Sequence, residues 1–211
     1  MNDAMPPARP ALFPGALLVI DTETTGLPGH QWTQPVELAA VLLDATGAEV
    51  SAFEILIRPP ILDSRADDAL RISGLTRARL WSEGIAPVYA RQALLSWLRG
   101  QQQQPERVYA FNMAFDCQML RRIGIDLQEI APLDCVQSEA TRAGSRGRLA
   151  VIAERLGVPV QQPAHRALAD ARTAAGVLVR LRAMMPPEPE PEPEAASVGQ
   201  MSLFSFSGGA K

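Results

Sequence analysis

The stretch that most constrains the fold is "ALLVIDTET", in which an apolar run over residues 16–20 leads directly into Asp21 and Glu23. Five consecutive apolar residues predict a buried strand over residues 16–22. Asp21 and Glu23 are two positions apart, so on a strand both side chains point to the same face. Because a charged group is costly to remove from water, this pair of carboxylates needs a compensating charge, and a bound cation supplies one.

Further apolar runs predict the rest of a sheet. Residues 35–44 ("PVELAAVLLD") and 48–59 ("AEVSAFEILIRP") follow as two strands joined by the turn "ATG". A fourth strand is predicted over residues 107–111 ("RVYAF"). Helical spacing appears in five segments: residues 66–72, 86–98, 115–123, 148–156 and 165–184. Strands first, followed by strand and helix in alternation, predict an α/β fold with a mixed sheet, antiparallel at first and then parallel, flanked by helices.

The length and the charge distribution indicate one domain with a tail. A chain of 211 residues with 47% hydrophobic content can bury one sizeable core. We expect the domain to span residues 1–185, because "PPEPEPEPE" begins a segment, residues 186–211, that cannot form a core. The acidic and basic residues of 1–185 balance, and the tail carries the net charge of −3. A neutral domain is not a nonspecific nucleic-acid coat, so any polyanion must be bound locally.

Cysteine content and hydropathy bear on the compartment. Cys117 and Cys135 are too few for a disulfide framework, so we expect two buried thiols and a reducing cytoplasm. The longest apolar run, residues 16–20, is far too short to cross a membrane. The expected location is therefore cytoplasmic, without a membrane partner.

Two more acids and a histidine complete a candidate site. Asp116 ends "NMAFD", just beyond the fourth strand, and Asp170 ends "HRALAD". His165 precedes Asp170 by five residues, a spacing that favours a position on the loop before the helix. Four acids suit two hard ions, Mg²⁺ or Mn²⁺, better than zinc. Two such ions about 4 Å apart activate water for phosphodiester hydrolysis, and a neutral imidazole can take the proton.

Three motifs together resemble a known family. "DTETTG", "NMAFD" and "HRALADA" are similar in order and spacing to the motifs of DnaQ-like (DEDDh) 3′-to-5′ exonucleases of the ribonuclease T superfamily, over residues 17–181. The resemblance implies a ribonuclease H-like fold, with His165 as the general base. It implies four metal ligands: Asp21, Glu23, Asp116 and Asp170. The expected activity is the release of nucleoside 5′-monophosphates from DNA 3′ ends, in proofreading or repair at the nucleoid.

Contacts with the substrate are expected from loops beside the acids. The backbone at Thr24, Thr25 and Gly26 can approach the terminal nucleotide, and Asn112 precedes the acid of the second motif. Arg146 lies in the glycine-broken stretch "TRAGSRGR", which is either a phosphate-binding loop or an ordinary solvated loop.

The tail resembles a second, shorter motif. "QMSLF" is similar to the peptide that binds the bacterial sliding clamp, which implies contacts from Gln200, Leu203 and Phe204. The 14-residue spacer before it reaches roughly 40 Å if extended, enough to tether an exonuclease near a primer terminus. The alternative is that the apolar end packs back onto the domain. A DNA polymerase is a further candidate partner.

Two other functions remain open at the level of sequence. Relatives with the same acids trim RNA 3′ ends, and nothing in the motifs rejects a 2′-hydroxyl. A non-catalytic clamp-binding module would require a defective ligand set, whereas all five catalytic positions are filled.

Overall fold

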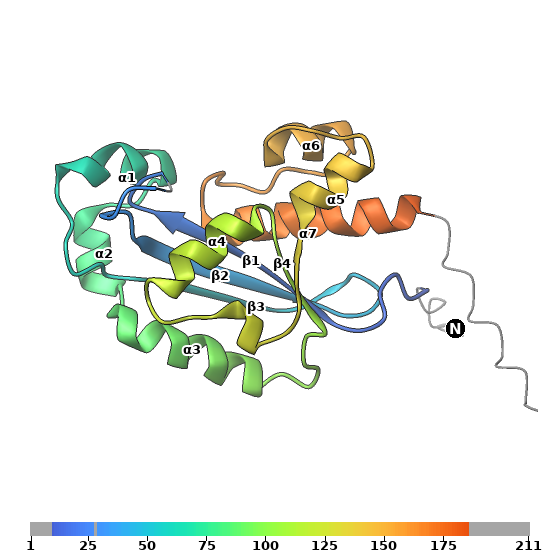
Figure 1. Ribbon diagram of the computed structural model, residues 1–211, viewed down its shortest axis with the longest axis horizontal. Coiled ribbons are helices and arrows are strands. Elements are labelled where there is room, and N and C mark those ends of the chain that lie inside the picture. The colour runs from blue at the N-terminus through green and yellow to red at the C-terminus, as the bar shows by residue number, and fades with distance from the viewer. Residues whose placement is uncertain (1–9, 28, 186–211) are drawn as a thin grey trace, which may run out of the picture.

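The computed structural model describes residues 10–27 and 29–185, whose centre is a five-stranded mixed sheet (Figure 1). The strand order is β3-β2-β1-β4-β5. β1 pairs antiparallel with β2 and β2 with β3, whereas β4 runs parallel to β1 and β5 parallel to β4. The predicted fold class, a ribonuclease H-like mixed sheet with helices, is confirmed. The strands are β1 (Leu17–Thr24), β2 (Pro35–Leu43), β3 (Glu49–Leu56), β4 (Arg107–Ala110) and β5 (Leu133–Cys135).

Helices cover both faces of this sheet (Figure 1). α3 and α4 pack on one face, and α7, with α5 and α6 beside it, packs on the other. α1 and α2 form a smaller apolar cluster with the ends of β2 and β3. The α-helices are α1 (Asp67–Ser73), α2 (Arg77–Glu83), α3 (Pro87–Arg99), α4 (Met113–Arg121), α5 (Val136–Arg142), α6 (Leu149–Arg155) and α7 (Ala167–Met184); two 3₁₀ turns are η1 (Ser64–Ala66) and η2 (Leu127–Glu129).

β1 is central and is buried on both faces. Leu18 and Ile20 pack into the cluster that includes α3 and α4, whereas Leu17 and Val19 pack against α7. A strand covered on both sides needs apolar residues at every position, which explains the unbroken run before Asp21.

The strand directions bring distant motifs to one edge of the sheet. β1 and β4 are parallel, so their carboxyl ends lie at the same edge, and α4 begins at Met113, immediately after β4. α7 packs across β1 and β2. The carboxyl ends of parallel strands are where α/β proteins commonly bind ligands.

Several elements differ from the sequence-based expectation. β5, α2 and α5 were not predicted: three residues are too few to show the alternation of a strand, and the two helices were not recognised although α1 and α6, which are equally short, were. Cys117 is buried as expected, but Cys135 is only half-buried, so the prediction of two buried thiols was wrong for it. Within the described residues, no helix is both long and apolar enough to traverse a bilayer. Gln200, Leu203 and Phe204 lie outside the described residues, and the domain boundary at residue 185 stays a prediction.

Candidate active site

The two acids of β1 point toward α7. Asp21 and Glu23 continue the alternation of Leu17 and Val19, and both are partly exposed at the end of the strand. In the antiparallel pairing with β2, Asp21 lies opposite Ala39 and Glu23 opposite Glu37. The two carboxylates therefore lie at the end of β1, beside the start of α7, where the side chains are no longer fully buried.

The third motif meets Glu23 at this point. Asp170 lies in the first turn of α7, and His165 lies in the loop that leads into the helix, as its spacing predicted. One ligand atom from each of Glu23, His165 and Asp170 lies within 4.8 Å of the other two. His165 is exposed and adopts a φ of 60°, a left-handed conformation that is rare for a residue with a β-carbon.

Asp116 reaches the edge from the opposite face of the sheet. It lies in the first turn of α4 and is only 3% exposed. Thr22, which lies between the two acids of β1, points to the α4 side, and its hydroxyl donates a hydrogen bond to Asp116 Oδ1 at 2.9 Å. The residue between the acids thus connects the first motif to the second.

Burial and mutual repulsion raise the pKa values of the acids. Burial is the main cause of a raised pKa at Asp21, followed by the charges of Asp116, Glu23, Asp170 and Glu37. Burial, with the charge of Asp170 next, raises the pKa of Glu23 to about 8, against a weaker opposing effect of Arg166.

Burial is also the largest cause of the raised pKa at the other two acids. Burial raises the pKa of Asp116 to about 7, although the hydrogen bond from Thr22 lowers it. Burial also raises the pKa of Asp170, partly offset by His165. Burial is thus the main cause of the raised pKa at all four acids, and repulsion by other carboxylates adds to it at Asp21, Glu23 and Asp170.

These side chains fit a divalent cation. The Glu23 and Asp170 carboxylates lie within 4.8 Å of each other at a partly open edge, and carboxylate oxygens are the ligands that hard divalent ions prefer. Asp21 and Asp116 are not members of this close group, although the charge of Asp116 acts on Asp21. Burial and the neighbouring acids disfavour the charged form of Asp21 and Glu23, and a positive charge nearby opposes both effects. His165 lies within reach of the same point, so its imidazole can serve either as a base beside the cation or as a nitrogen ligand.

The loop after β1 is shaped by its own hydrogen bonds. The Thr24 hydroxyl donates to the Gly26 carbonyl at 2.8 Å, and the Thr25 amide donates to the Gln34 carbonyl at 2.9 Å. The Thr25 hydroxyl also accepts from the Gln34 amide. The Thr25 amide is therefore already paired within the protein, and the expected substrate contacts of Thr24, Thr25 and Gly26 stay predictions.

The two other expected substrate contacts have different surroundings. Asn112 is the N-cap residue of α4, and its side chain makes no capping hydrogen bond. It therefore lies one turn before Asp116 at the same edge. Arg146 is exposed on the loop between α5 and α6, where its carbonyl accepts from Arg155 at 2.7 Å. The structure does not connect Arg146 to the acids.

Sequence reasoning missed Glu37 and Arg166. Glu37 is fully buried in β2 and forms an ion pair with Arg166, the residue that follows His165. A signal was present: Glu37 is a single charged residue inside the apolar run "PVELAAVLL", where an unpaired charge would be costly. Its partner, 129 positions away, carried no comparable signal.

Comparison with known structures supports the same fold. A 3′-exonuclease that recognises the 3′ end of histone mRNA stem-loop is 16% identical, with a TM-score of 0.65 over 80% of this chain and 63% of that one. E. coli exonuclease I in complex with a dA16 oligonucleotide is 17% identical, with a TM-score of 0.66 over 80% of this chain and 41% of its own. The nuclease domain of 3′hExo, a DEDDh family member bound to rAMP, is 17% identical, with a TM-score of 0.63 over 79% and 91% of the two chains.

Sequence comparison identifies the family. No curated protein sequence matches the chain significantly. The chain spans less than two thirds of the first structure and less than half of exonuclease I. Residues 18–178, however, match the model of the RNase_T exonucleases, and this range contains all five residues of the candidate site. Because the match covers most of its length, the chain belongs to the RNase_T exonuclease family.

Proposed function

We propose that this exonuclease removes nucleoside 5′-monophosphates from the 3′ ends of DNA in a reaction that depends on two Mg²⁺ or Mn²⁺ ions. The observation that supports the proposal is the approach of Glu23, His165 and Asp170 to within 4.8 Å of one another, with the charges of Asp116, Glu23 and Asp170 acting on Asp21. Asp21, Glu23, Asp116 and Asp170 would hold the cations. Bound there, the ions would polarise the phosphate and activate the attacking water.

The protein side chains have distinct tasks in this proposal. His165, exposed at the edge of the acid cluster, accepts the proton of the attacking water. The Thr22 hydroxyl orients the Asp116 carboxylate by a hydrogen bond on the α4 side of the sheet. The backbone of Thr24 and Gly26 approaches the terminal nucleotide. The edge is open to solvent at His165, so a chain end can enter and the product can leave.

We favour DNA over RNA as the substrate because of the expected role in proofreading or repair. The residues of the site itself do not distinguish the two substrates. Exonuclease I with its dA16 oligonucleotide supports DNA, whereas the mRNA-binding 3′-exonuclease and 3′hExo with rAMP support RNA. RNA 3′-end trimming is therefore the second candidate function.

One assay separates these possibilities. Oligonucleotides of single-stranded DNA, duplex DNA and RNA, each labelled at the 5′ end, are incubated with Mg²⁺ or Mn²⁺ and with a chelator. We expect a ladder of shortened 5′-labelled DNA that the chelator abolishes. Faster shortening of RNA than of DNA would favour RNA trimming over the DNA proposal. Release of the 5′ label as a mononucleotide would show that the enzyme degrades from the 5′ end and not from the 3′ end. Inertness toward all three substrates would favour a non-catalytic binding module.

The tail adds a proposed location. We propose that Gln200, Leu203 and Phe204 bind the bacterial sliding clamp and so raise the local concentration of the nuclease at DNA ends. Apolar residues in a segment of low core-forming content commonly insert into a partner's pocket.

The tail proposal has its own test. The double variant Leu203→Ala and Phe204→Ala is compared with the unaltered chain for clamp binding and for turnover of short oligonucleotides. We expect clamp binding to be lost and turnover to be unchanged. If the variant still binds the clamp, the tether does not depend on this motif.

A further inference from the structure

A buried carboxylate next to the active site remains without a role in the reaction described above. Glu37 lies in β2 with its side chain 0% exposed, and its register partner on β1 is Glu23. Paired residues of neighbouring strands face the same side, so Glu37 points toward α7 as Glu23 does. A carboxylate enclosed in this way is stable only when its oxygens are paired and hydrogen-bonded.

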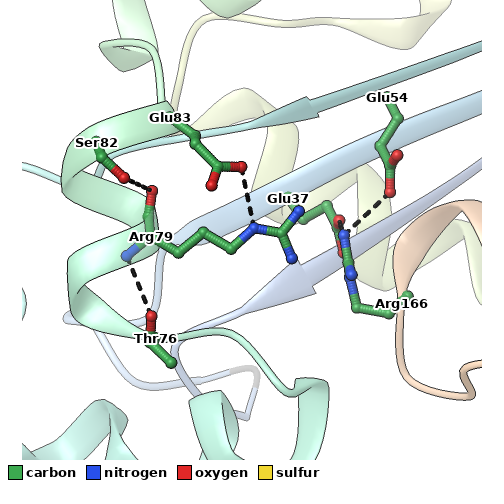
Figure 2. A network of polar contacts seen from close by, with 7 residues as sticks. All are labelled: Glu37, Glu54, Thr76, Arg79, Ser82, Glu83 and Arg166. Atoms are coloured by element: carbon green, nitrogen blue, oxygen red, sulfur yellow. Dashed lines mark hydrogen bonds and ion pairs between the residues drawn. The ribbon is translucent and has the colours of Figure 1, made fainter.

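Arg166 and the start of α7 provide this pairing. Arg166 Nε lies 3.0 Å from Glu37 Oε1 and 3.1 Å from Oε2, and Arg166 Nη2 also donates to Oε1. The amide of Ala167 donates to Glu37 Oε2 at 3.0 Å. On its outer side Arg166 Nη2 contacts Glu54 of β3 at 3.2 Å. Figure 2 shows Arg166 beside both carboxylates, at the point where the chain enters α7.

Glu37 also acts as the cap of α7. The N-cap residue of that helix, Arg166, makes no capping hydrogen bond with its own side chain. The Glu37 carboxylate caps the helix instead, because it accepts a hydrogen bond from the amide of the first helical residue. It also places a negative charge at the positive end of the helix dipole. The start of α7 is thereby attached to a strand adjacent to β1.

The attachment lies between the two residues of the third motif. Arg166 follows His165 directly, and Asp170 is one turn further along α7, where its amide donates to the Arg166 carbonyl at 2.9 Å. His165 has a φ of 60°, and such a backbone persists only where neighbouring contacts hold it. A change at Arg166 should therefore alter the positions of both His165 and Asp170 relative to Glu23.

We propose that Glu37 is a positioning residue of the active site: through Arg166 and the Ala167 amide it sets where His165 and Asp170 stand relative to the acids of β1. This inference rests on the proposed function. Glu37 touches neither substrate nor cation in this role. Residues that do not bind a metal themselves but hold its ligands in place have a comparable role. Their removal generally lowers metal affinity or activity roughly 10- to 100-fold.

The test is Glu37→Gln, which keeps the shape of the side chain but removes its charge and one acceptor oxygen. Turnover of 5′-labelled single-stranded DNA is measured with metal in excess, and Mn²⁺ binding is measured by electron paramagnetic resonance without nucleic acid. We expect kcat to fall about 10- to 100-fold with KM nearly unchanged, and Mn²⁺ affinity to fall about 10-fold or more.

A matched control separates positioning from stability. Arg172 and Glu49 form a second ion pair between α7 and the sheet, at 2.7 Å, but both side chains are more than one third exposed. Glu49→Gln should leave kcat and Mn²⁺ affinity within about twofold of the unaltered protein. If Glu37→Gln lowers the midpoint of urea unfolding yet keeps kcat and Mn²⁺ affinity, Glu37 is merely structural and the inference is overturned.

A second variant covers failure of the first to fold. Arg166→Lys keeps the positive charge but cannot contact both carboxylate oxygens of Glu37 in the same planar geometry. A folded Arg166→Lys protein should lose kcat about 10-fold, and unchanged kcat would overturn the inference. An inactive unaltered protein would instead contradict the proposed function, and the Mn²⁺ measurement would still test the role of Glu37.

Discussion

The hydroxyl of Thr22 donates a hydrogen bond to the buried carboxylate of Asp116, across 94 positions of sequence and 2.9 Å of space. Asp21 and Glu23 point to the α7 side of the sheet, whereas Thr22 points to the α4 side. A single strand therefore supplies acids to the site and at the same time orients the acid that arrives from α4.

Replacement of Thr22 by Val should lower activity. The change leaves Asp116 Oδ1 without this donor in a buried position and removes a contact that lowers the pKa of Asp116. We expect kcat to fall about 10-fold, measured on single-stranded DNA with saturating metal. Thr22→Ser keeps the hydroxyl and is the control. Equal losses in the two variants would mean that packing of the methyl group, and not the hydrogen bond, is what matters.

Without metal, the protein should become less stable as the pH rises from about 4.5 to about 8. In the folded state the pKa of Glu23 is raised from 4.5 to about 8, and the pKa values of Asp21, Asp116 and Asp170 are raised as well. The folded protein thus binds more protons than the unfolded chain in this range, so the free energy of unfolding falls as these protons are released.

Urea unfolding with a chelator at pH 5, 6.5 and 8 measures this effect. We expect a decrease on the order of 2 to 5 kcal/mol over the range, smaller when Mg²⁺ or Mn²⁺ is added, because a cation replaces the lost protons. Stability that rises with pH in the chelated protein would contradict the raised pKa values.

Replacement of Asp21 by Asn should separate stability from function. Burial, followed by the charges of four other acids, raises the pKa of Asp21, so removal of its charge relieves both the cost of burial and the repulsion in the metal-free protein. At pH 8 we expect the variant to be about 1 to 2 kcal/mol more stable than the unaltered protein in the presence of a chelator. Activity should fall roughly 100-fold or more, and stabilisation by added metal should shrink.

Asp68→Asn is the matched control for Asp21→Asn. The Asp68 side chain is 89% exposed on α1 and forms a surface ion pair with Arg71. Neither activity nor metal-dependent stability should change in this variant. A destabilised Asp21→Asn protein would show that the acid forms a structural contact that outweighs the repulsion.

Variants of His165 distinguish a base from a metal ligand. His165→Ala and His165→Gly should both lose most turnover, since each lacks the imidazole. If the imidazole is the base, both variants keep Mn²⁺ binding; loss of binding would make His165 a ligand instead. Because His165 has a φ of 60°, the Gly variant should be about 1 kcal/mol more stable than the Ala variant in urea unfolding.

Much of the architecture follows from local patterns. The continuous apolar run of β1 predicted a buried strand, which the structure covers on both faces, and the order of strands and helices predicted a mixed sheet. The predicted loop position of His165 agrees with the structure, because a spacing of five residues does not place two side chains together on one helix. The strand β5 was missed because three residues are too few to show an alternation, whereas α2 and α5 were missed although α1 and α6, which are equally short, were predicted.

The chain alone was enough to indicate the chemistry, since the type and spacing of Asp21, Glu23, Asp116, His165 and Asp170 are local properties of three motifs. The burial of these residues and the charges around them could not be predicted from the motifs. The hydrogen bond from Thr22 to Asp116 and the ion pair of Glu37 with Arg166 join residues 94 and 129 positions apart. Burial and distance between such residues arise only when the sheet and α7 pack together, and electrostatic energies depend on both.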